Sequence, residues 1–183
     1  MKRNTDLDFI RAILIILMIL IHIVSFGNAY PHLKAGILSF MMPTFLIITG
    51  YLVNIEKTGR QMGNYLKCLA LPYVIMVTGF SVLSYYMPVR DGITELSLSQ
   101  IGEKIFITSI GPYWFIQTMI ICGTLYYFCF SGRNWNDLHK NYTKRDTYAS
   151  LFVFAVTLLL ISETPALSAS AAAYYFIGVV IRQ

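Results

Sequence analysis

The first long apolar segment of the chain constrains the fold most, because an uncharged stretch of this length is unusual in a soluble domain. From Phe9 to Phe26 the single formal charge is that of Arg11, and the ten residues between Arg11 and His22 are all hydrophobic. About 18 consecutive apolar residues are enough for a membrane-spanning helix. The sequence therefore predicts a transmembrane helix that carries two ionisable side chains within its length.

These two side chains share one face of the predicted helix. Arg11 and His22 are eleven positions apart, which is roughly three helical turns and about 16 Å along the axis. In a continuous helix Asp8 and Ser25 fall on the same face. Ionisable groups inside a span are costly and indicate a functional site by default. We expect this polar stripe to face protein or a water-filled cavity.

The composition is typical of a polytopic membrane protein, since 56% of the 183 residues are hydrophobic, 13% are charged and the mean hydropathy is +0.61. Six candidate spans follow, at residues 9–27, 36–55, 69–87, 112–130, 147–162 and 166–181. We predict an all-α transmembrane helical bundle that forms a single domain over residues 1–183. The segment 88–111 predicts a short helix at the membrane surface or over a cavity.

The Lys and Arg residues that give the net charge of +5 are distributed unevenly between the two sides of the predicted membrane. With the amino terminus in the cytoplasm, eleven Lys and Arg residues lie inside and three, Lys34, Arg90 and Lys104, lie outside. Cytoplasmic loops carry such an excess of positive charge. We therefore expect both termini to be cytoplasmic in a multi-pass protein of the plasma membrane, with the lipid bilayer and not nucleic acid as partner. The cysteines have no metal-ligand spacing, so no metal is expected.

Four segments match, in order, the pattern of one protein family. They are LDFIR followed by ten apolar residues and His22 (7–22), SFMMPTFLIITGY (39–51), YLKCLALPY (65–73) and YWFI (113–116). In these segments the chain resembles the acyltransferase-3 family of integral-membrane O-acyltransferases, and YYFIG (174–178) resembles it more loosely. The resemblance implies transfer of an acyl group, usually acetyl, from acyl-CoA to a hydroxyl of a cell-surface or lipid-linked carbohydrate.

The chain departs from the family pattern in two ways. Many members carry paired arginines before the proline of the third span, where this chain offers Lys67 and, further back, Arg60. Family members also have more spans than the six found here, so we expect the chain to correspond to the first part of such a protein, as a fragment, a truncated product or a reduced variant. A homo-oligomer could supply further helices.

The implied chemistry assigns roles to these residues. Attack of a hydroxyl on a thioester needs a base, and histidine suits that role near neutral pH. We predict that His22 activates the acceptor hydroxyl or briefly accepts the acyl group. Coenzyme A is polyanionic and needs cationic partners, so we predict that Arg11 positions the donor, with Lys67 and Arg60 as further contacts for its phosphates. No permanently bound cofactor is expected.

Other interpretations of these residues stay open. His22 could be a hydrogen-bonding residue between helices, and Arg11 could extend to the headgroups and pair with Asp8. Lys67 and Arg60 could be topology charges that bind no ligand. Tyr113 and Trp114 are predicted to line the acceptor cavity, or else to form an aromatic belt. The alternative functions are a transporter or flippase component for a glycolipid or sugar, and an inactive truncated acyltransferase. Consumption of acyl-CoA distinguishes the enzyme from the transporter.

Overall fold

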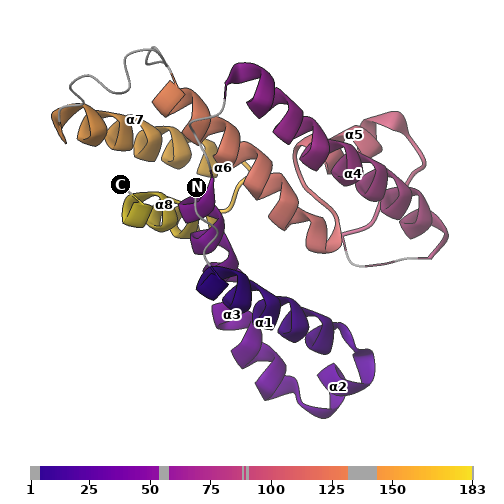
Figure 1. Cartoon of the computed structure of the whole chain (residues 1–183). Coiled ribbons are helices and arrows are strands. Elements are labelled where there is room, and N and C mark those ends of the chain that lie inside the picture. Colours follow the sequence, from indigo (N-terminus) through magenta and orange to yellow (C-terminus); the bar gives the residue numbers. More distant parts are fainter. Residues whose placement is uncertain (1–4, 54–57, 88, 90, 132–143, 183) are drawn as a thin grey trace. The chain divides into compact units, whose positions relative to one another are not determined.

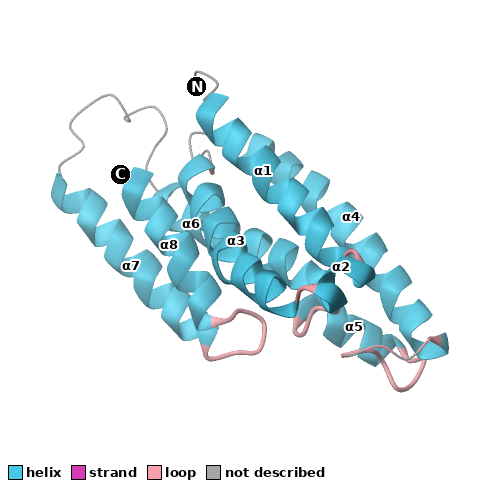
Figure 2. Cartoon of the chain, turned by 90° about the horizontal axis from the view of Figure 1, so that it is seen from below, coloured by secondary structure: helices cyan, strands magenta, loops and turns pink. Residues whose placement is uncertain are grey.

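The computed structural model describes residues 5–53, 58–87, 89, 91–131 and 144–182. Among these residues there are helices and loops but no strands (Figure 2). The elements in chain order are α1 (Thr5–His22), α2 (Val24–Ala29), α3 (Pro31–Leu52), α4 (Gly59–Tyr86), α5 (Leu98–Phe106), the 3-10 helix η1 (Gly111–Tyr113), α6 (Trp114–Ser131), α7 (Lys144–Ser162) and α8 (Ala169–Arg182) (Figure 1). The predicted all-α class is confirmed.

A helix occupies each of the six segments that hydropathy selects, but the helices differ in their suitability as spans. Within the described residues, three are long and apolar enough to cross a membrane: Pro31–Leu52, Gly59–Tyr86 and Gly111–Phe130. The two shorter apolar helices, Asp146–Ser162 and Ala169–Arg182, correspond to the last two predicted spans. The number of spans and the location of the termini stay predictions.

The first predicted span is not one continuous helix. Helix α1 ends at His22, and Ile23 adopts an extended conformation with φ −71° and ψ 111° before α2 begins. The Ile23 amide donates to the Leu20 carbonyl at 3.2 Å, a tighter turn than that of an α-helix. The expectation that Ser25 continues the polar face of α1 is therefore wrong.

Helix α4 begins earlier than hydropathy indicates. A capping box starts it: the Thr58 hydroxyl accepts from the Gln61 amide at 3.4 Å, and the Gln61 side chain accepts from the Thr58 amide at 3.1 Å. This pair satisfies two amides that the first turn leaves free. The segment between the second and third predicted spans is thus helical from Gly59 onward, because a polar cap can begin a helix before its apolar part does.

The contacts divide the chain into two compact units, which are described separately. The amino-terminal unit comprises Met1–Leu52 and Tyr174–Arg182, and the central unit comprises Val53–Ala173. The division falls within α8.

In the amino-terminal unit, α1 and α3 lie side by side and α2 forms the turn between them (Figure 1). The buried residues of this core are Leu14, Ile21, Ile37, Met41 and Ile48. They are spaced by seven positions on α1 and by four and seven positions on α3, so they form one apolar stripe per helix. This packing places the end of α1 beside the beginning of α3.

Helices α3 and α8 approach each other closely at two glycines. A Cβ atom on Gly50 would overlap the carbonyl oxygen of Tyr175, and a Cβ on Gly178 would overlap that of Ile47. Small residues at helix contacts let backbones come together in membrane proteins. Beyond the glycines, the Arg182 guanidinium donates to the Tyr51 carbonyl at 3.4 Å, near the end of α3.

The central unit has an apolar cluster formed by α4 and the segment that precedes α6. Its buried residues are Tyr73, Val77 and Ile110. Elsewhere in the unit, α6 and α7 pack through the rings of Tyr126 and Phe154, with centroids 5.5 Å apart. Helix α4 and helix α7 each contact the region around α6, and these two separate contacts hold the unit together.

The short helix predicted within 88–111 is confirmed as α5, and side chains from two other helices hold its carboxyl end. The Tyr73 hydroxyl donates to the Ile105 carbonyl at 2.9 Å. The Gln117 side-chain amide donates to the carbonyls of Phe106 and Ile107 at 3.2 and 3.3 Å. These bonds satisfy carbonyls that have no partner within the helix.

We expect Gln117→Leu to loosen the end of α5. Gln117 is 5% exposed, so its loss leaves carbonyls without a donor, at a cost of about 1.4 kcal/mol, or roughly tenfold in a local equilibrium. Amide hydrogen exchange should accelerate about tenfold in residues 98–107 and stay constant in α7. Unchanged exchange in residues 98–107 would contradict this role.

Candidate functional site

His22 is the last residue of α1, and one of its ring nitrogens is hydrogen-bonded. Nδ1 lies 2.7 Å from the carbonyl oxygen of Met18. A carbonyl can only accept, so the proton of this bond is on Nδ1, and in the neutral ring Nε2 carries the lone pair. Nε2 has no hydrogen-bond partner among the residues that the structure describes. It is therefore free to accept a proton from a ligand.

His22 is the basic residue in the last turn of the 18-residue α1. Its side chain therefore lies at the carboxyl end of this helix, where the chain turns toward α2.

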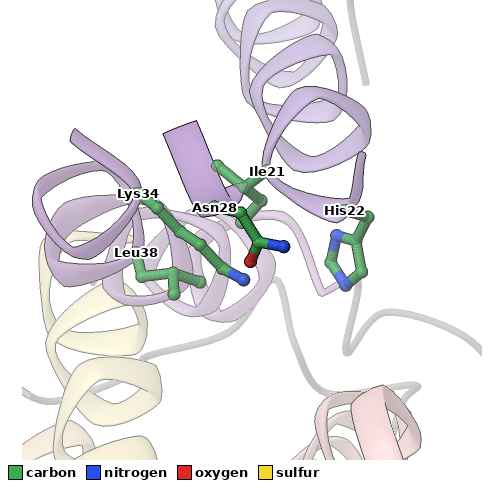
Figure 3. A pocket seen from close by; sticks show the side chains of 5 residues that line it. All are labelled: Ile21, His22, Asn28, Lys34 and Leu38. Atoms are coloured by element: carbon green, nitrogen blue, oxygen red, sulfur yellow. The ribbon is translucent and has the colours of Figure 1, made fainter. Parts of the chain in front are cut away.

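His22 lines a pocket formed by three consecutive helices. The lining residues are Ile21 and His22 from α1, Asn28 from α2, and Lys34 and Leu38 from α3 (Figure 3). The Asn28 side chain lies between the Lys34 ammonium group and the His22 ring in Figure 3. The cavity volume is about 220 Å³, below the range of about 300–1,000 Å³ that drug-sized ligands need. The pocket therefore has room for one small group.

The break after His22 builds this pocket. Because the chain turns at Ile23, α2 brings Asn28 back beside the end of α1. Helix α3 then begins at Pro31, so the segment between the first two predicted spans is helical from Pro31 onward. Proline is favoured at the first position of a helix. Pro31 could therefore have predicted that Lys34 lies in the first turns of a helix. The contribution of Lys34 to the pocket was not predicted from the sequence.

Arg11 lies on α1 as predicted, with His22 on the same continuous helix. Eleven residues of helix place the two about 16 Å apart along the axis and on one face. Arg11 is exposed. Its guanidinium group is therefore accessible to an external anion, and the alternative that it pairs with Asp8 stays a prediction.

Arg60 and Lys67 lie on α4 in the central unit, and both are exposed. They are seven positions apart, so they project from one side of the helix at a spacing of about 10 Å. The two charges thus form a short basic stripe on a helix. Lys57, which also falls between the second and third predicted spans, lies outside the described residues.

Tyr113 and Trp114 occupy different environments in the central unit. Tyr113 is half-buried, packs against the Tyr73 cluster and makes an edge-to-face contact with Phe80, with centroids 5.8 Å apart. Trp114 begins α6 and is 36% exposed. Tyr113 thus contributes to packing, whereas the face of Trp114 is more accessible. A role of either residue toward an acceptor stays a prediction.

The comparisons with known proteins agree with the pattern in the sequence. The family model for the acyltransferase domain of acyltransferase-3 proteins matches residues 4–183. No curated protein and no solved structure gives a significant match to this chain. The family match includes both units and every residue discussed above.

Proposed function

Because this chain belongs to the acyltransferase-3 family, we propose that it transfers an acyl group, acetyl above all, from acyl-CoA to a hydroxyl of a cell-surface or lipid-linked carbohydrate. The family and the apolar helices make it an integral membrane protein, and we propose a multi-pass arrangement in the plasma membrane. One observation carries the proposal: the Nδ1 bond of His22 to Met18 leaves Nε2 unpartnered beside a pocket.

In the proposed reaction, Nε2 of His22 removes the proton of the acceptor hydroxyl as its oxygen attacks the thioester carbonyl. A carbon–oxygen bond forms and gives a tetrahedral intermediate. The carbon–sulfur bond then breaks, the ester remains on the acceptor, and the imidazolium returns the proton to the departing thiolate of coenzyme A. The Nδ1 bond to Met18 keeps the ring oriented through these steps.

In this reaction Arg11 binds the donor, acyl-CoA. Its separation from His22, about 16 Å along α1, suits an elongated donor whose thioester reaches the histidine while its anionic portion stays near Arg11. The exposed guanidinium is suited to bidentate contact with phosphate. Arg60 and Lys67 are the further donor contacts in this proposal, and Trp114 and Tyr113 are the acceptor contacts.

The experiment that tests the function follows both substrates. Membranes that contain the chain, and matched membranes without it, are incubated with radiolabelled acetyl-CoA. We expect label in the glycan fraction and release of an equal amount of free coenzyme A in the first sample alone. Glycan or glycolipid movement across the membrane without consumption of acetyl-CoA would contradict the proposal in favour of a transporter.

We expect Arg11→Gln to raise the KM for acetyl-CoA by about tenfold or more, because a charge-assisted hydrogen bond contributes about 1.5–3 kcal/mol. The rate at saturating donor should change much less. Lys104→Gln is the matched control, since the Lys104 ammonium contacts the Thr108 hydroxyl at 3.4 Å and lies far along the chain from the pocket. Loss of transfer in Arg11→Gln with an unchanged donor KM would contradict donor binding by Arg11.

A further inference from the structure

We propose that Lys34 makes the His22 pocket selective for acceptors that carry a negative charge, a phosphate or a carboxylate, next to the hydroxyl that is acylated. This inference rests on the proposed function, in which His22 activates the acceptor hydroxyl in this pocket. It adds a substrate class and a specificity-determining residue.

Among the described residues, none forms an ion pair with Lys34. Lys34 is half-buried and lines the pocket. The other lining residues are the apolar Ile21 and Leu38, the neutral Asn28, and His22. A cation in partly apolar surroundings is costly unless an anion accompanies it. An anionic ligand would supply the missing counter-charge.

Gly27 allows Lys34 to take this position. A Cβ atom on Gly27 would lie 3.2 Å from both Cδ and Nζ of Lys34. The lysine side chain therefore lies across the glycine of α2, with its ammonium group beside the Asn28 side chain (Figure 3). A larger residue at Gly27 would push the ammonium group away without removing its charge.

The reaction itself increases the need for an anion. When His22 accepts a proton from the acceptor, the pocket contains an imidazolium and an ammonium, and these like charges repel each other. The beginning of α3 adds a partial positive charge, and its first turn contains no acidic residue. A phosphate or carboxylate on the acceptor neutralises this charge and holds the acceptor beside Nε2.

Binding of small sugars tests this inference without acyl transfer. The full chain in lipid nanodiscs is titrated calorimetrically with methyl glucoside, glucose 1-phosphate and glucuronate. We expect at least one of the charged sugars to bind about tenfold more tightly than methyl glucoside, as charge-assisted hydrogen bonds allow. Preference for glucose 1-phosphate alone assigns the anion as phosphate, and preference for glucuronate alone assigns it as carboxylate.

Four variants assign the preference to Lys34. Lys34→Gln should remove it, Lys34→Arg should retain it, and Lys104→Gln, the matched control, should leave it unchanged. Gly27→Val should weaken it while Lys34 is still present. Equal affinities for all three sugars in the wild type, no binding of any of them, or a charge preference that survives in Lys34→Gln would overturn the inference. Acetyl transfer without a charge preference would overturn this inference alone and leave the proposed function intact.

Discussion

Replacement of His22 by alanine is expected to lower kcat for acyl transfer by about 10²–10⁴-fold, the usual contribution of a general base. The fold should survive, because His22 is exposed and its hydrogen bond is to a backbone carbonyl of its own helix, that of Met18. The alanine variant therefore loses the proposed general base but very little side-chain packing. The measurement is acetyl transfer from radiolabelled acetyl-CoA in membranes with equal amounts of each protein.

His32→Ala is the matched control for this variant. His32 lies in the first turn of α3, is exposed and is not among the residues that line the pocket. The His32→Ala variant should transfer acetyl groups at the wild-type rate. Transfer by His22→Ala at the rate of the His32→Ala control would show that the hydroxyl is activated elsewhere.

Adding one methyl group at Gly178 or Gly50 is expected to destabilise the amino-terminal unit by about 3 kcal/mol or more, the upper part of the range for overpacked sites. Each new Cβ would meet a backbone carbonyl of the neighbouring helix, closer than real Cβ contacts occur. Backbone atoms cannot rotate away as side chains can. Helices α3 and α8 would have to separate, which also weakens the contact of Arg182 with Tyr51.

Gly36→Ala provides the comparison on the same helix. Gly36 lies on α3, and a Cβ atom there meets nothing within 4 Å. This variant should be as stable as the wild type or gain up to about 1 kcal/mol from the better helix propensity of alanine. Thermal unfolding in detergent compares Gly36→Ala, Gly50→Ala and Gly178→Ala. Equal melting temperatures for all three would show that the close crossing of α3 and α8 is not needed for stability.

The positions of the helices follow from the sequence, but their ends do not. Hydropathy finds every apolar helix because the burial of a long segment in lipid depends on its own residues. It does not find the beginning of α4, where Thr58 and Gln61 start a helix in polar sequence. Nor does it find the turn at Ile23, which lies inside the first predicted span and at which the Ile23 amide donates to the Leu20 carbonyl.

The sequence by itself determined that the chain is a set of apolar helices and that Arg11 and His22 share a face of the first one. Both conclusions depend on local properties, hydropathy and helical periodicity, which adjacent residues supply. Only the tertiary structure decided that Asn28 and Lys34 meet His22 in one pocket, and that Gly50 and Gly178 bring α3 and α8 together. These features depend on a change of chain direction and on contacts between residues that are distant in the sequence, and no local pattern encodes either.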